Sequence, residues 1–106
     1  MAKFIQDEAA FTNLLDTAEV LVVDCTATWC GPCKLVAPLI DRLAEEYGDR
    51  AQIFKLDIDT NKPIADRFNI RSIPAVIFFK KGESIETLIG VKTYAEFRSS
   101  LETLLD

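Results

Sequence analysis

Residues 20–34 read VLVVDCTATWCGPCK, and they decide the fold because they join a strand pattern to a helix pattern through two cysteines. Residues 20–26 are apolar on both alternating faces, as in a strand buried at the centre of a sheet. After the second cysteine, apolar residues recur at helical spacing, and these are Leu35, Val36, Leu39, Ile40, Leu43 and Tyr47. Cys30 and Cys33 are therefore expected where a buried strand ends and a helix begins.

This position suits a redox-active dithiol. The N-terminus of a helix presents unpaired N–H groups and the positive end of the helix dipole, and both stabilise a thiolate on Cys30. Cys33 lies one helical turn further in, and two intervening residues allow the sulfurs to close a short disulfide ring. We interpret Cys30 as the attacking nucleophile and Cys33 as the resolving thiol. The alternative, half of a zinc ribbon or an inert pair, lacks the partner ligands that a metal site needs.

Apolar periodicity outside this stretch alternates between strands and helices. Further strands are expected over 3–5, 51–57, 75–80 and 83–89, the last two joined by a turn at Lys81-Gly82. A helix is expected after Asp7, with Phe11, Leu14 and Leu15 buried, and a short one after Thr60 or Asn61. A final helix is expected after Thr93, which forms a capping-box pattern with Glu96, and its inward-facing residues are Phe97, Leu101 and Leu104. Gly48 is expected to cap the C-terminus of the helix that follows Cys33. The order βαβαβαββα predicts one α/β domain over residues 1–106, with a mixed sheet between helices.

Composition excludes several classes of function. The 17 acidic and 12 basic residues give a formal net charge of -5, which argues against binding to nucleic acid or to an anionic membrane surface. No apolar run is long enough to span a membrane, and acidic residues in 1–8 stand where an export signal would be apolar. The chain has 3 cysteines and no histidine, so we expect no metal site, no cofactor, and a cytoplasmic location rather than secretion.

Several motifs resemble those of the thioredoxin family. Residues 23–34 are similar to its active-site signature, residues 69–74 (NIRSIP) to its loop before a cis-proline strand, and residues 79–83 (FKKGE) to its hairpin. Gly90 matches an exposed glycine late in the family's sequence, and the resemblance covers essentially the whole chain. It implies the thioredoxin fold, a central mixed β-sheet of about five strands flanked by four helices, in agreement with the element order.

The resemblance also assigns roles to individual residues. It implies that Asp24, whose burial should raise its pKa, accepts a proton from Cys33 and that Lys55 tunes this carboxyl group. It implies a cis Ile73–Pro74 bond and pairing of the Ile73 backbone with a bound peptide. The flat apolar docking surface would consist of Trp29, Gly31, Pro32, Ile73, Pro74 and Gly90.

These roles predict a protein-disulfide reductase that maintains cytosolic redox state and donates electrons to target enzymes. A reductant is favoured because Pro32, between the cysteines, has neither an N–H nor a charge that would further stabilise the reduced form. The resemblance implies disulfide-containing client proteins, a thioredoxin reductase linked to NADPH or ferredoxin, and a monomer. Three alternatives stay open: a disulfide oxidase or isomerase, a binding subunit that uses the same apolar face without turnover, and a metal or cluster shared by two chains.

Two residues depart from the usual pattern of the family. Cys25 and Thr26 occupy positions where the family usually has phenylalanine and tryptophan. Loss of the tryptophan removes a large aromatic ring beside the site, which bears on packing there and on the choice of partner. We interpret Cys25 as a small buried apolar residue, and the alternative is a regulatory thiol.

Overall fold

The computed structural model describes residues 1–105 and contains one five-stranded sheet. The strands are β1 (Lys3–Phe4), β2 (Val20–Thr26), β3 (Gln52–Asp57), β4 (Ala75–Lys80) and β5 (Glu83–Ile89), and their order across the sheet is β1-β3-β2-β4-β5. β1 and β2 pair with β3 in parallel, whereas β4 pairs antiparallel with β2 and with β5. The mixed sheet predicted from the element order is therefore confirmed.

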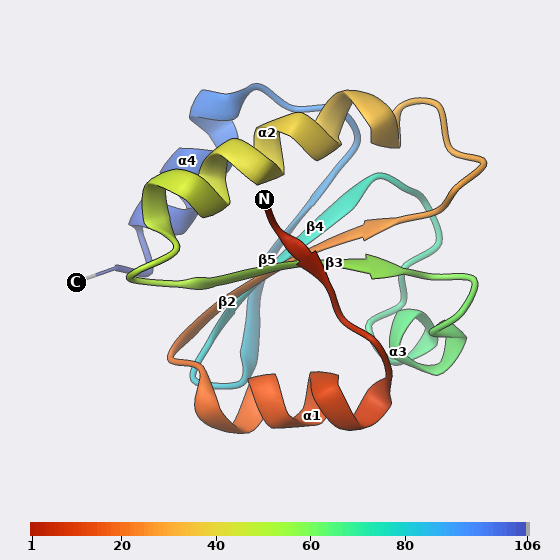
Figure 1. The fold of residues 1–106 in the computed structure, drawn as a ribbon, viewed down its shortest axis with the longest axis horizontal. Helices are drawn as coiled ribbons and strands as arrows, with labels where there is room; N and C mark the ends of the chain where they lie inside the picture. The colour runs from red at the N-terminus through yellow and green to blue at the C-terminus, as the bar shows by residue number, and fades with distance from the viewer. Residues whose placement is uncertain (106) are drawn as a thin grey trace.

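Helices cover both faces of this sheet (Figure 1). α2 (Cys33–Tyr47) and α4 (Tyr94–Glu102) lie on one face, and α1 (Glu8–Thr17) and α3 (Lys62–Arg67) lie on the other. The order βαβαβαββα is the one predicted. No helix within residues 1–105 is long and apolar enough to cross a membrane.

Capping side chains explain where two of these helices begin. The carboxylate of Asp7 accepts a hydrogen bond at 2.9 Å from the backbone N–H three residues further on. Thr93 and Glu96 form the predicted capping box, in which each side chain accepts a backbone N–H of the other residue. Asn61 occupies the N-cap position of α3, but its side chain donates to the Asp57 carbonyl instead of capping the helix.

β2 is the central strand and packs on both faces. Val20 and Val22 belong to the core on the side of α2 and α4, and Leu21 and Val23 belong to the core on the side of α1 and α3. None of the four is more than 3% exposed. Burial on both faces explains the nearly continuous apolar run of this strand, and it anchors the dithiol that follows to the middle of the molecule.

Four leucines are less buried than the helical patterns predict, and the two in α2 are exposed Leu35 and half-buried Leu39. Leu35 is 63% exposed, because the buried side of α2 runs through Val36 and the residues three to four positions further on, and Leu35 lies about 100° away around the helix. In α1, Phe11 occupies the fully buried position, and Leu14 and Leu15 are half-buried beside it. The one-sided burial of a short surface helix leaves the flanks of its apolar stripe partly in water.

Gly48 ends α2 as predicted, but not through a left-handed conformation. Its φ of -62° and ψ of -17° are those of a right-handed helix. A Cβ at this position would lie 2.5 Å from the carbonyl oxygen of Ala44. The glycine is therefore required by lack of space rather than by backbone dihedral angles.

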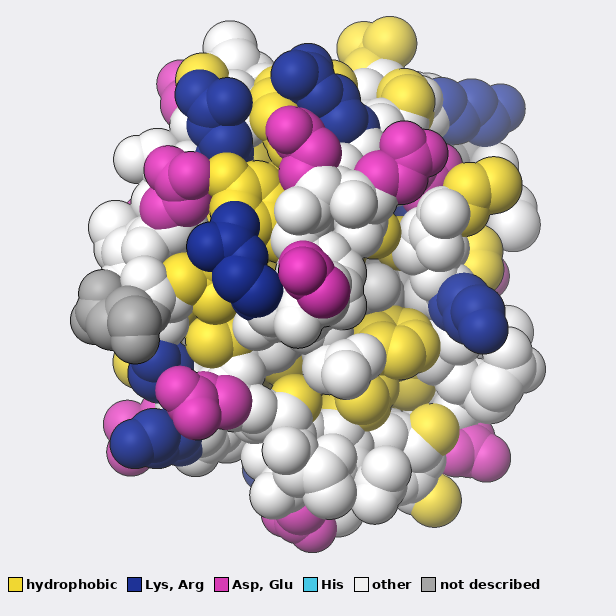
Figure 2. Space-filling view, turned by 60° about the vertical axis from the view of Figure 1, so that its left-hand side comes forward, with side chains coloured by type: hydrophobic (Ala, Val, Ile, Leu, Met, Phe, Trp, Pro, Cys, Tyr) yellow, Lys and Arg dark blue, Asp and Glu magenta, His cyan; other side chains and the backbone are white. Residues whose placement is uncertain are grey.

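Charged side chains of both signs are mixed on the face that Figure 2 shows, with small hydrophobic areas between them. On this face, therefore, the charges do not form a field of one sign.

Candidate active site

The two cysteines follow the central strand directly. Cys30 lies in the turn after β2, and Cys33 is the first residue of α2. Their sulfurs form a disulfide with the Cα atoms 5.3 Å apart, so the structure is that of the oxidised protein. The two residues are 4% and 2% exposed, respectively, which limits attack on either sulfur to a partner that docks closely.

One backbone amide at the start of α2 is directed at the first sulfur. The N–H of Cys33 donates to Sγ of Cys30 at 3.2 Å. The next two amides, of Lys34 and Leu35, donate to the carbonyls of Gly31 and Pro32 at 3.0 and 3.1 Å. The Cys33 amide and the positive end of the helix dipole therefore supply the stabilisation that a thiolate on Cys30 would receive here.

Trp29 forms a large apolar projection next to Cys30. Its side chain is 67% exposed, although its indole Nε1–H donates to Oδ2 of Asp59 at 2.7 Å. Asp59 was not identified from the sequence. The signal that could have found it is its position just after β3, because β2 and β3 are parallel and their carboxyl ends meet at the same edge of the sheet.

The remaining residues of the predicted docking surface differ in how far they reach solvent. Gly31 and Pro32 are exposed, and Ile73 is half-buried against the pair of cysteines. The Ile73–Pro74 peptide bond is cis, as the resemblance implied, but Pro74 itself is buried. Its ring lies beneath the surface instead of forming part of it. Gly90 is half-exposed with a φ of 96°, and its N–H donates to the Pro74 carbonyl at 2.8 Å.

Asp24 is a buried carboxyl group without a hydrogen-bond partner among the described residues. It is 1% exposed, and neither of its oxygens accepts a hydrogen bond within residues 1–105. Burial raises its pKa to about 7, with the Asp41 carboxylate adding to the rise and the Lys55 ammonium opposing it. The carboxyl group can therefore exchange a proton near neutral pH.

Lys55 is buried close to this carboxyl group but forms its ion pair elsewhere. Its Nζ lies 2.9 Å from Oδ1 of Asp41 in α2. The sequence did not identify Asp41 as part of the site. The available signal was weak: a polar residue directly after buried Ile40, at the flank of the apolar stripe of α2.

Cys25 is fully buried, with 0% exposure, and is a free thiol. Burial raises its pKa to about 12, and the neighbouring Asp24 carboxylate contributes to the rise. The interpretation of this residue as a small buried apolar side chain agrees with its position. Thr26, the other departure from the family pattern, is half-buried, and its carbonyl accepts the N–H of Ile58 at 3.0 Å.

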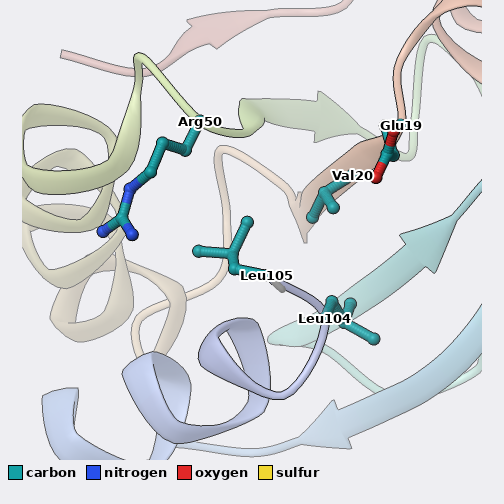
Figure 3. Close-up of a pocket in the computed structure, with 5 residues that line it drawn as sticks. All are labelled: Glu19, Val20, Arg50, Leu104 and Leu105. Atoms are coloured by element: carbon teal, nitrogen blue, oxygen red, sulfur yellow. The ribbon is translucent and has the colours of Figure 1, made fainter.

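A hollow of about 360 Å³ lies at the opposite end of β2 (Figure 3). It is lined by Glu19, Val20, Arg50, Leu104 and Leu105. Because β2 runs from Val20 toward the dithiol, the length of a seven-residue strand separates this hollow from the sulfurs. This hollow is therefore not part of the site around the cysteines. Within residues 1–105, no group of three or more histidine, cysteine or acidic side chains is placed to hold a metal ion.

The fold and the disulfide at the start of α2 define a dithiol–disulfide oxidoreductase. Residues 2–103 match the family model described as Thioredoxin. The chain belongs to the thioredoxin family, as the motifs indicated.

Individual relatives agree with this assignment. The chain is 46% identical over 101 residues to "Thioredoxin M-type, chloroplastic" of Spinacia oleracea, a match that covers 95% of this chain and 56% of the length of that relative. It is 32% identical to "Thioredoxin 1" of Synechococcus elongatus, with 96% of this chain and 95% of that protein covered. The crystal structure of Malassezia sympodialis thioredoxin superposes with a TM-score of 0.89 at 30% identity, covering 96% of this chain and 91% of the other. These matches confirm the predicted fold.

Proposed function

We propose that this protein reduces disulfide bonds in other proteins and donates to them the electrons of Cys30 and Cys33. The observation that carries the proposal is the Cys33 amide directed at Sγ of Cys30 beside the exposed ring of Trp29. Once the pair is reduced, the amide and the helix dipole favour a thiolate on Cys30. The exposed ring gives a client protein an apolar surface to contact.

The reaction consists of two thiol–disulfide exchanges. The Cys30 thiolate attacks one sulfur of the client disulfide, a bond forms between Cys30 and the client, and the other client sulfur leaves as a thiolate. The Cys33 thiolate then attacks Sγ of Cys30, which releases the second client thiolate and forms the Cys30–Cys33 disulfide. Two electrons pass to the client, and another dithiol must reduce the pair before the next cycle.

Asp24 is the proposed acceptor of the proton that Cys33 loses. Because Cys33 is buried, its proton needs an acceptor inside the protein. A carboxyl group with a pKa of about 7 is partly ionised at neutral pH and can both take up and release a proton. The lone pairs of Asp24 are not engaged by hydrogen bonds from residues 1–105. Lys55 tunes this acceptor through its charge.

Clients are proposed to dock on the surface around the disulfide, through Trp29, Gly31, Pro32, Ile73 and Gly90, with Pro74 supporting it from below. The half-exposed position of Ile73 beside the cysteines supports pairing of its backbone with an extended client segment. Main-chain pairing is largely independent of client sequence, which suits an enzyme with many substrates.

The electrons are proposed to come from a thioredoxin reductase linked to NADPH or ferredoxin, because each turnover leaves the pair oxidised. We propose that the protein acts as a monomer in the cytoplasm, where thiols are kept reduced. A reducing role is favoured over an oxidising one because Pro32 places no N–H and no charge between the two cysteines.

Trapping of clients tests the proposal. A Cys33→Ser variant should accumulate mixed disulfides at Cys30, detected on non-reducing gels and located by peptide mass spectrometry, because the second exchange is blocked. Cys30→Ser is the matched control and should form none. Absence of adducts with Cys33→Ser, or adducts at Cys33 in the control, would contradict the assigned roles. A redox potential above about −200 mV in equilibrium with glutathione would overturn the reducing direction.

A further inference from the structure

Two carboxyl groups and one ammonium group lie together beneath α2. Asp24 in β2 and Lys55 in β3 are partners in the register of the parallel strands, so both side chains extend from the same face of the sheet. Asp41 extends toward them from α2, which covers that face. Asp24 and Lys55 are 1% and 7% exposed, so water does not screen the charges of this cluster effectively.

The ammonium group is not shared between the two carboxyl groups. Nζ of Lys55 lies 2.9 Å from Oδ1 of Asp41. Neither oxygen of Asp24, the register partner of this lysine, has a hydrogen-bond partner within residues 1–105. Asp24 is thus unpaired although a cation stands on the adjacent strand, because that cation is engaged by the helix above.

Asp41 is itself held by the backbone. Its Oδ1 also accepts a hydrogen bond from the N–H of Ala2 at 3.0 Å. Ala2 is 7% exposed and is part of the core under α2 and α4. A carboxylate fixed by one buried amide and one ammonium group is a better partner for Lys55 than a carboxyl group without any donor of its own.

The other groups around Asp24 do not replace this lysine. Apart from Asp41 and Lys55, no charged group in the described part of the chain shifts the pKa of Asp24, and β4 places the apolar side chain of Val76 opposite it. The next residue along β2 is Cys25, whose side chain belongs to the core on the other face of the sheet. The charge that Asp24 experiences is therefore set by the lysine on β3 and by the carboxylate that holds it.

We propose that Asp41 is a positioning residue, which holds the Lys55 ammonium group on α2 and so keeps it from pairing with the Asp24 carboxyl group. This inference rests on the proposed role of Asp24 as proton acceptor. A buried site with two carboxyl groups and one ammonium group is electrically neutral when one carboxyl group is protonated. Because Asp41 has the donors, Asp24 is the one that keeps the proton.

The titration of Asp24 in the oxidised protein tests this proposal without any turnover. The midpoint is read from the ¹³C chemical shift of the Asp24 carboxyl carbon, assigned by its loss in Asp24→Asn. In Asp41→Asn, which keeps an oxygen for the Ala2 amide, Lys55 is released toward Asp24. The midpoint should then fall by about one pH unit or more, since an adjacent cation favours the ionised form. Asp41→Ala is the second variant and should shift the midpoint in the same direction.

Two comparisons separate positioning from simple charge removal. Glu45→Gln removes one negative charge from an exposed position of the same helix and should leave the midpoint unchanged. Lys55→Met should raise the midpoint, and adding Asp41→Asn to that variant should produce a much smaller fall than it produces in the wild type. An unchanged midpoint in folded Asp41→Asn overturns the proposal, and so does a fall of full size in the Lys55→Met background.

The pH dependence of client reduction distinguishes this inference from the proposed function. If Asp24 accepts the proton of Cys33, the rate of client reduction rises with pH as Asp24 ionises. In Asp41→Asn, this rise should move to lower pH together with the titration midpoint of Asp24. A midpoint that falls while the rate profile stays in place supports the positioning role of Asp41 and refutes the role of Asp24 as proton acceptor. The two failures are therefore separate observations.

Discussion

Replacement of Asp24 by asparagine should stabilise the protein by an amount that depends on pH. The folded state holds the Asp24 pKa at about 7, whereas the ordinary value is 3.8. Between these two values the folded protein keeps a proton that the unfolded chain has released, so stability falls as the pH rises through this window. Below pH 4 both states are protonated, and above pH 7 the full cost of burying the charge is present.

The expected gain in stability follows from the difference between the pKa of Asp24 in the folded protein and its ordinary value. A change of about 3 pH units at 1.36 kcal/mol per unit corresponds to roughly 4 kcal/mol. Asp24→Asn, which is never charged, should therefore gain about 4 kcal/mol over the wild type at pH 8 and almost nothing at pH 4. The chain has no histidine, so no other side chain with an ordinary pKa titrates between pH 5 and 8.

Urea unfolding of the oxidised proteins at a series of pH values measures the difference in free energy of unfolding between Asp24→Asn and the wild type. Cys30 and Cys33 do not titrate in these proteins because they are joined in a disulfide. Asp49→Asn, at an exposed position, is the matched control and should show the pH dependence of the wild type. A wild-type free energy of unfolding that does not change between pH 5 and 7.5 would refute the reasoning. So would a gain in Asp24→Asn that is the same at pH 4 and pH 8.

Two further predictions concern residues near the dithiol, and a third concerns the C-terminal end of α2. Asp59→Ala removes the hydrogen bond that orients Trp29 and should lower kcat/KM for a protein disulfide by about 2- to 10-fold, with the redox potential unchanged; an altered potential would contradict this. Cys25 should resist alkylation in the native oxidised protein and react on unfolding, and rapid native modification would show that it is not buried. Gly48→Ala should destabilise the fold by about 1–3 kcal/mol in urea unfolding, because the added Cβ would lie too close to the Ala44 carbonyl oxygen. A gain in stability would contradict this and would mean that the end of α2 shifts to accommodate the Cβ.

The fold could be predicted from the sequence because its signals are local. The apolar run of β2, the capping box at Thr93 and Glu96, and the glycine at the hairpin each depend on a few consecutive residues. The position of Cys30 and Cys33 followed from the same pattern. Errors arose where burial depends on what packs above an element, as for Leu35 on the outer side of α2.

The environment of the buried charges could not be predicted in the same way. Asp41 contacts Ala2 across 39 positions of the sequence, and Asp59 contacts Trp29 across 30. Such contacts depend on the angle at which a helix crosses the sheet and on the rotamers of long side chains, and neither has a sequence period. The resemblance implied that Lys55 lies near Asp24, but only the folded structure shows that Asp41 holds the lysine.

The deep position of Cys25 has a consequence for the protein in storage and in oxidative stress. Burial raises the pKa of this thiol and keeps it protonated at neutral pH, and peroxide or a second molecule cannot reach it. Oxidation therefore ends at a closed ring between neighbouring sulfurs. Although the chain has an odd number of cysteines, its oxidised form has no reactive sulfur that could crosslink molecules into aggregates.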